Sequence, residues 1–304
     1  MEVVRTPEQR FAALEGYDFA PHYREVTADD GTQLRFHFVD EGPTDAAPVL
    51  LMHGNPSWSY VHRNMIRGLV AAGHRVIALD LMGLGRSDKP TARSDYTLAR
   101  HVDWVGQWLQ AEDLNDITLY CQDWGGLIGL IAMTLDPDRF ARVIASNTGL
   151  PVGEGVNKFM KQWLEFSQNI DFLPIGDLVA GGTTRPLSDA EKAAYDAPFP
   201  DSSYQASALQ FPLLIPVQPD NAGVPMARET WVRLAQWQKP FLTVFGSADA
   251  VAFKARAHLK FQEVVPGAAG QAHRVIEGAN HFIQEDAPDE LVDLIDAFIP
   301  KGNQ

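Results

Sequence analysis

Short, uninterrupted apolar runs alternate with helical segments along most of this chain. Runs at 48–52, 75–80, 116–122 and 142–146 lack the polar alternation of a strand that has one face in water. Such runs are typical of strands buried on both faces, and intervening helices connect these strands in parallel. The sequence therefore predicts an α/β fold.

Further strands and helices complete the predicted sheet. The additional strands are expected at 22–27, 34–39, 240–245 and 273–276. The first two form a hairpin around an Asp30-Gly31 turn. The flanking helices are expected at 59–72, 98–109, from about 127, and at 289–299. We therefore expect a mostly parallel sheet of eight strands flanked by helices.

The strand pattern stops after Asn147 and resumes near residue 240. The segment 151–219 instead contains helical stretches at 158–168, 189–195 and 204–211, separated by turns rich in Pro and Gly. A helical insertion explains this pattern better than two consecutive domains. We expect a helical cap at 151–219, inserted into one core domain formed by 1–150 and 220–304.

Composition excludes several kinds of partner. Lys and Arg total 25 and Asp and Glu total 39, so the formal net charge is −14. That charge repels phosphate backbones and anionic lipids, so we expect neither nucleic-acid nor membrane binding. A single cysteine, Cys121, excludes an internal disulfide and a Cys-rich metal site. No signal peptide is visible, and we expect a cytoplasmic protein unless an export signal was removed.

The segment CQDWGG at 121–126 lies where a predicted strand turns sharply into a helix. Small residues two before and two after Asp123 allow a tight turn that exposes the central side chain, as in the nucleophile elbow of hydrolases. The alternative is that Asp123 only caps the following helix, because Asp is a favoured N-cap residue.

Two residues after later strands favour the elbow. Asp249 follows the predicted strand 240–245, and His281 follows the strand 273–276. The carboxyl ends of parallel strands meet at one edge of a sheet, where ligands bind. The order nucleophile, acid and histidine is that of α/β-hydrolases. We therefore expect Asp249 to orient His281, and His281 to activate water.

The segment HGNP at 53–56 follows the first buried strand. Hydrolases place half of an oxyanion hole at this position, and an ordinary turn is the alternative. The backbone N–H groups of Asn55 and Trp124 would then donate to one oxygen.

An aspartate nucleophile indicates the class of substrate. Asp is ionised at neutral pH and needs no base for its first attack. Attack of Asp123 on a saturated carbon gives an ester that water can hydrolyse, whereas a serine would give a stable ether. The elbow therefore favours halides or epoxides over acyl compounds. For a halide, the indole N–H groups of Trp124 and of Trp163, in the predicted cap, could bind the leaving group. The alternative for Trp163 is simple packing.

These residues resemble the haloalkane dehalogenases of the α/β-hydrolase superfamily. The similar segments extend over nearly the whole chain and comprise HGNPSWSY (53–60), GLGRSDKP (83–90), QDWGG (122–126), YDAPFP (195–200) and GANHFIQE (278–285). In the subgroup with two halide-binding tryptophans, the pattern matches Asp123, Asp249, His281, Trp124 and Trp163. Another subgroup has its acid after an earlier strand, but residues 146–148 (SNT) contain no carboxylate, which favours Asp249.

One position departs from the two-tryptophan pattern. That subgroup often has Glu where this chain has Asn55, and Asn there is typical of relatives that bind halide with Asn and one Trp. The second halide donor could therefore be Trp163, Asn55 or both. By analogy, Phe159, Phe166 and Leu127 would line the substrate cavity.

The resemblance implies a small apolar halogenated substrate, water as second substrate, and no metal or cofactor. We expect a monomer, with weak association as the alternative. An epoxide hydrolase is the nearest competing function, for which Tyr195 and Tyr204 could activate the epoxide oxygen. The same scaffold could also serve a luciferase-like oxygenase or a binding receptor.

Overall fold

The computed structural model describes residues 1–156 and 158–300, with only the backbone of Phe159. Its main sheet has eight strands in the order β10-β9-β8-β7-β4-β5-β3-β2. The strands are β2 (His22–Thr27), β3 (Gln33–Glu41), β4 (Pro48–Met52), β5 (Arg75–Leu79), β7 (Ile117–Gln122), β8 (Phe140–Ser146), β9 (Phe241–Gly246) and β10 (Arg274–Ile276). The predicted α/β fold is confirmed.

Only one end of the sheet is antiparallel. Strand β3 pairs antiparallel with both β2 and β5, and the remaining strands pair in parallel. Strands β4, β7 and β9 are buried along their whole length, as their continuous apolar sequences predict. A second, two-stranded sheet of β1 (Val3–Val4) and β6 (Lys89–Pro90) was not predicted.

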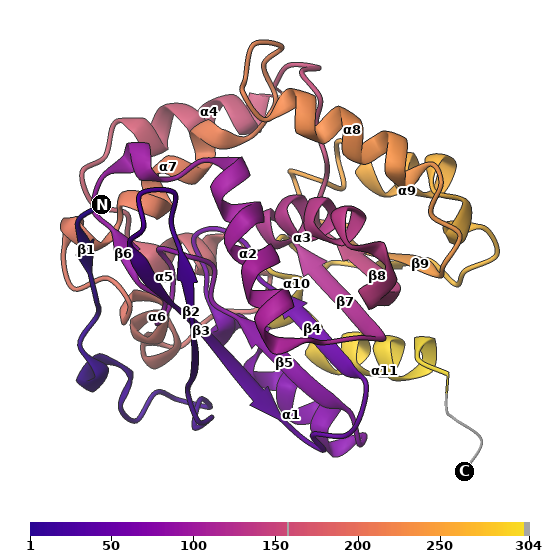
Figure 1. Ribbon diagram of the computed structural model, residues 1–304, viewed down its shortest axis with the longest axis horizontal. Coiled ribbons are helices and arrows are strands. Elements are labelled where there is room, and N and C mark those ends of the chain that lie inside the picture. The colour runs from indigo at the N-terminus through magenta and orange to yellow at the C-terminus, as the bar shows by residue number, and fades with distance from the viewer. Residues whose placement is uncertain (157, 301–304) are drawn as a thin grey trace.

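Two groups of helices cover the faces of the main sheet (Figure 1). Helices α1 and α11 pack together on one side, and α2, α3 and α8 pack in succession on the other. The helices of the core are α1 (Arg63–Ala71), α2 (Leu98–Glu112), α3 (Trp124–Leu135), α8 (Val224–Leu234), α9 (Ala257–Val264), α10 (Ile283–Asp286) and α11 (Pro288–Phe298). The 3₁₀ turns are η1 (Glu8–Phe11), η2 (Ser59–His62), η3 (Arg93–Asp95), η4 (Pro137–Arg139), η5 (Ser202–Tyr204) and η6 (Pro266–Ala268).

Four more helices lie between β8 and β9 in the sequence. They are α4 (Lys158–Gln168), α5 (Ile175–Gly181), α6 (Asp189–Asp196) and α7 (Ala206–Leu214). Helix α4 packs against α7, and α5 against α6 (Figure 1). This arrangement is consistent with an inserted cap, whose limits at 151 and 219 stay a prediction. Over the described ranges, no helix combines the length and apolarity that a bilayer crossing requires.

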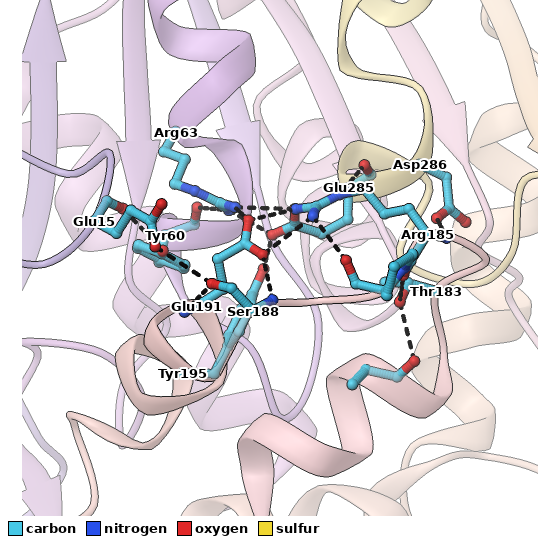
Figure 2. Close-up of polar contacts among 12 residues, drawn as sticks. Glu15, Tyr60, Arg63, Thr183, Arg185, Ser188, Glu191, Tyr195, Glu285 and Asp286 are labelled. Carbon is cyan, nitrogen blue, oxygen red and sulfur yellow. Dashed lines mark hydrogen bonds and ion pairs between the residues drawn. The ribbon is translucent and has the colours of Figure 1, made fainter.

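A buried ionic cluster fastens α6 and the loop before it to the core (Figure 2). The Glu285 carboxylate, in α10, accepts from Arg63 of α1, from Arg185 and from the hydroxyl of Tyr195. Glu191 of α6 completes the cluster, with its Oε1 2.6 Å from Arg63 Nη2 and 2.7 Å from Arg185 Nη2. The cluster thus has balanced charge, with Glu285 and Arg63 buried and with Glu191 and Arg185, 13% and 33% exposed, on the side toward solvent.

We predict that Glu285→Gln lowers the free energy of unfolding by about 3 kcal/mol or more. The guanidinium groups of Arg63 and Arg185 would then share a single carboxylate, which leaves one positive charge of the cluster uncompensated. Urea unfolding measures the change. The exposed pair Lys161–Glu165 provides the control, since its side chains are 69% and 64% exposed. Glu165→Gln should leave the unfolding midpoint almost unchanged. An equally small change in the free energy of unfolding for both variants would contradict the conclusion that the ionic cluster stabilises the fold.

Candidate active site

The carboxyl ends of four strands bring the predicted site residues together. Asn55 follows β4, Asp123 follows β7, Asp249 follows β9, and His281 follows β10. The carboxylate of Asp123 lies between two of these neighbours. Its Oδ1 accepts a hydrogen bond from the backbone N–H of Asn55 at 2.9 Å, and its Oδ2 lies 3.5 Å from His281 Nε2.

Asp123 has the strained backbone of an elbow. Its φ of 51° and ψ of −121° lie in a region that costs L residues about 1–3 kcal/mol. The neighbouring strand holds this conformation, because Asp123 N donates to Asn147 O and Thr148 Oγ1 donates to Asp123 O at 2.8 Å. The side chain makes no cap hydrogen bond to α3, so interpreting Asp123 as a helix cap is wrong.

Glycines make room for this turn. A Cβ on Gly125 would lie 2.3 Å from Met52 O, and one on Gly126 would lie 1.9 Å from Thr148 Oγ1. A Cβ on Gly54 would lie 2.2 Å from Asp123 Oδ1. All three distances are too short for any side chain, so these positions let α3 begin directly after Asp123, three residues before the expected start near 127.

His281 is held on its other side by Asp249. His281 Nδ1 lies 3.2 Å from Asp249 Oδ1, and the Asp249 side chain is buried. The backbone N–H groups of Val251, Ala252 and Phe253 donate to the same carboxylate at 2.9, 2.9 and 3.1 Å. Asp249 is therefore held in place to accept a hydrogen bond from His281 Nδ1. With Nδ1 bound in this way, the other ring nitrogen, Nε2, faces Asp123.

The two carboxylates control the charge of His281. Burial alone lowers the pKa of this imidazole, but hydrogen bonds and charge from Asp123 and Asp249 outweigh burial and raise the pKa to about 10. For Asp249, burial raises the pKa, and the hydrogen bond and charge of His281 lower it below its usual value. At neutral pH the arrangement is therefore an imidazolium between two carboxylates.

Two amide side chains around His281 were not predicted. Gln122 Nε2 lies 3.3 Å from His281 Nε2 and donates to His281 O at 3.2 Å. Asn147 Nδ2 donates to the carbonyls of Asn280 and His281 at 2.8 and 3.0 Å. Both residues adjoin strand ends that the sequence identified, which is the signal that could have revealed them.

A cavity of about 390 Å³ opens onto the carboxylate of Asp123. Asn55, Trp124, Trp163 and His281 line it, together with residues that were not predicted: Met160, Leu178, Gly182, Ile215, Ala248, Ala250, Val251 and Phe282. Across the part of the chain that the structure describes, neither Trp124 nor Trp163 donates its indole N–H to a protein acceptor. Both indoles can therefore donate to an anion in this cavity.

One of the two N–H donors of the Asn55 side-chain amide already has a protein acceptor. Its Nδ2 donates to Ala208 O of α7 at 3.3 Å, and its Oδ1 is buried without a partner among the described residues. One amide hydrogen remains free, so Asn55 stays a candidate second halide donor beside Trp163.

A second cavity, of about 530 Å³, shares five lining residues with the first: Asp123, Trp124, Met160, Ile215 and Val251. Leu127, which was expected to line the substrate cavity, lines this larger one. Phe166 lines neither cavity. Its ring stacks on Trp163, with the ring centroids 6.0 Å apart, and the residue is 42% exposed to solvent. The expectation for Phe166 is therefore corrected, and the side chain of Phe159 lies outside the described residues.

The tyrosines considered for epoxide chemistry lie away from both cavities. Tyr195 is buried, and its hydroxyl donates to Glu285 in the ionic cluster (Figure 2). Tyr204 ends the turn η5 and is not a lining residue of either cavity. Within the described ranges, no group of three or more His, Cys, Asp or Glu side chains is arranged to hold a metal ion.

Comparisons with known proteins agree with this geometry. Residues 47–288 match the family model of the alpha/beta hydrolase fold. A haloalkane dehalogenase of Psychrobacter cryohalolentis is 50% identical over 98% of each chain. One from Mycobacterium marinum is 49% identical over 97% of this chain and 99% of the relative. The solved structure of tetrameric haloalkane dehalogenase DpaA from Paraglaciecola agarilytica has a TM-score of 0.89 at 35% identity, covering 98% of this chain and 97% of that one.

We predict that His281 remains protonated well above neutral pH, titrating near pH 10. Its raised pKa means that the imidazolium stabilises the fold below about pH 6.5 and that this contribution is lost as pH rises toward 10. NMR titration of the nine histidines, with His281→Gln to assign the signal, measures the pKa. Asp123→Asn should lower it, because one of the two carboxylates is removed. A wild-type pKa at or below 6.5 would contradict this electrostatic arrangement.

Proposed function

Because the chain belongs to the haloalkane dehalogenases, a family with the α/β-hydrolase fold, we propose that it hydrolyses the carbon–halogen bond of small apolar haloalkanes. The products are an alcohol, a halide ion and a proton. One observation carries the proposal: Asp123, Trp124 and Trp163 line one cavity, and neither indole N–H has a protein acceptor among the described residues.

In the first step an Asp123 oxygen attacks the carbon that bears the halogen. A carbon–oxygen bond forms, and the carbon–halogen bond breaks with its electron pair leaving on the halide. The indole N–H groups of Trp124 and Trp163 donate to the departing halide, with the Asn55 amide as a further candidate. These donors stabilise the charge that develops on the leaving group.

Alkylation prepares His281 for the second step. The ester formed at Asp123 is neutral, so the imidazolium loses one of the two carboxylates that raise its pKa. The pKa of His281 then falls, and its Nε2 proton passes to solvent. Asp249 still faces Nδ1 at 3.2 Å and keeps Nε2 directed at the ester.

The neutral imidazole then accepts a proton from water as the water attacks the ester carbonyl. The backbone N–H of Asn55, already 2.9 Å from Asp123 Oδ1, and that of Trp124 stabilise the oxyanion. Collapse of this intermediate breaks the bond between the acyl carbon and the alkoxy oxygen. The departing oxygen takes the second proton of the added water and leaves as the alcohol, which returns Asp123 as a carboxylate beside protonated His281. The proton lost to solvent before this step balances the overall reaction.

Epoxide hydrolysis has less support. Ring opening needs an acid that donates to the epoxide oxygen, and Tyr195 already donates its hydroxyl to Glu285 outside both cavities. Trp124, Trp163 and Asn55, which line the smaller cavity, carry indole and amide N–H groups, and these groups suit an anion that needs no proton.

Asp123, Asp249 and His281, the proposed catalytic residues, meet within a single chain. We therefore propose that a monomer is sufficient for activity. The tetrameric state named for DpaA belongs to that relative.

We predict that the protein releases halide from 1-haloalkanes and that His281→Gln arrests the reaction at the ester. The variant retains the Asp123 nucleophile and loses the base, so the intact protein should gain the mass of one alkyl group. Mass spectrometry after incubation with an active bromoalkane, and peptide mapping to residue 123, measure this adduct.

Asp123→Asn is the matched control, since it keeps the shape of the side chain and removes the nucleophile. It should give neither halide nor adduct. A styrene oxide assay run in parallel reports the competing function. Diol formation without halide release, or absence of the adduct in His281→Gln, would overturn the proposed reaction.

We predict that Trp163→Phe weakens chloride and bromide binding about tenfold, because one charge-assisted hydrogen bond to the halide is lost. Halide quenching of tryptophan fluorescence measures the dissociation constant. Phe166→Leu is the control, because Phe166 contacts Trp163 without lining either cavity. Unchanged binding in Trp163→Phe would assign the second donor to Asn55, and Asn55→Ala then tests that role.

A further inference from the structure

Two loops that are far apart in the sequence are joined beside His281. One is the segment 182–185 between α5 and α6, and the other is the segment 278–282 that follows β10. Phe282 N donates to Gly182 O at 3.0 Å, and Thr184 Oγ1 donates to Gly278 O at 2.6 Å. The two segments therefore form one hydrogen-bonded unit.

Asp286, at the end of α10, completes this unit with both of its carboxylate oxygens. Its Oδ1 accepts from the backbone N–H groups of Thr184 and Arg185 at 2.8 and 3.0 Å. Its Oδ2 accepts from the backbone N–H of Asn280 at 2.7 Å. A single carboxylate thus connects the segment 182–185 to the segment that carries His281.

The connection continues to His281 itself. Asn280, held by Asp286, accepts the backbone N–H of His281 on its own Oδ1 at 2.9 Å. Asn147 Nδ2 meets the carbonyls of both Asn280 and His281 from the opposite side. The position of the imidazole relative to the strands is therefore set by Asn147, and its position relative to the segment 182–185 is set by Asp286.

The same unit forms part of the substrate cavity. Gly182 and Phe282 both line the smaller cavity, and a Cβ on Gly182 would lie 2.7 Å from the ring of Phe282. The unit therefore borders the cavity, whereas Asp286 itself is not one of the lining residues.

We propose that Asp286 is a positioning residue for hydrolysis of the ester, which keeps His281 directed at Asp123 by fastening its loop to the segment 182–185. The inference rests on the proposed two-step reaction. Asp286 touches neither substrate nor the reacting atoms, and it acts through Asn280. The first step needs only Asp123 and the halide donors, so a disturbance at Asp286 affects the second step selectively.

Asp286→Asn tests the proposal with little change in volume. An amide has one acceptor oxygen and one donor nitrogen, whereas the native carboxylate accepts on both sides. The variant keeps either the Asn280 contact or the contacts to Thr184 and Arg185, and it places an N–H group against an N–H group on the other side. The side-chain contacts of the neighbouring Glu285 cluster do not involve Asp286, so the substitution leaves those contacts in place.

The experiment is single-turnover kinetics with a 1-bromoalkane, using rapid-quench mass spectrometry to follow the alkylated protein. In Asp286→Asn we expect ester hydrolysis to slow about tenfold or more, because small displacements of a catalytic group are costly. Alkylation should stay within about twofold of wild type, so the ester accumulates. The pH dependence of hydrolysis should also change, because the contact of His281 with its partners is altered.

Asp196→Asn is the matched control. Its carboxylate accepts the backbone N–H of Gly176 at 3.0 Å, which joins α5 to α6 without reaching the loop of His281. We expect both steps to remain near wild-type rates in this variant. Thr184→Val, which removes the bond to Gly278, is a milder second variant and should slow ester hydrolysis less than Asp286→Asn.

Equal slowing of both steps in Asp286→Asn, or a profile indistinguishable from that of Asp196→Asn, would overturn the positioning role. If Asp286→Asn does not fold, Thr184→Val decides the question, and unchanged ester hydrolysis in it overturns the inference. Failure of the proposed reaction is separate, because it would appear as a missing adduct in His281→Gln.

Discussion

The site depends on one strained residue held from several sides. Asp123 adopts a positive φ only because Gly125 and Gly126 admit neighbouring atoms and because Asn147 O and Thr148 Oγ1 bind its backbone. The elbow projects the carboxylate toward the N–H of Asn55 and the imidazole of His281. Strands β4, β7, β8 and β10 contribute to this arrangement, so the parallel sheet and the chemistry are inseparable.

Charge balance links this geometry to the order of events. The resting site has two carboxylates and one imidazolium, and the raised pKa of His281 reflects both negative groups. In the proposed reaction, formation of an ester removes one of these two negative charges and so lowers the pKa of His281. The first step would thus release the base for the second, while Asp249, held by three backbone N–H groups, keeps the imidazole oriented.

The sequence predicted the features that have a periodic or positional signature. Strand β4 and helix α4 match their expected limits, and the residues at the strand ends converge as expected. Helices α5, α8, α9 and α10 were not predicted. Helices α5, α9 and α10 are short, with seven, eight and four residues, whereas α8 has 11 residues, as many as α4, and was missed. Gln122 and Asn147 adjoin strand ends that the sequence identified, but their hydrogen-bond partners, like those of Asp286, lie on loops that no local pattern indicates. The prediction that Phe166 lines the cavity was wrong, because the family resemblance does not indicate which aromatic side chain of α4 is exposed to solvent.

Two unequal cavities, of about 390 and 530 Å³, share Asp123 among their lining residues, and in the proposed reaction this has a stereochemical consequence. Displacement at saturated carbon would place the halogen opposite the attacking oxygen, beside the indole donors. The two arms of a secondary halide would then face unequal surroundings, and mirror-image substrates would exchange these arms. The handedness of the alcohol formed would therefore depend on the shape of the walls around the carboxylate.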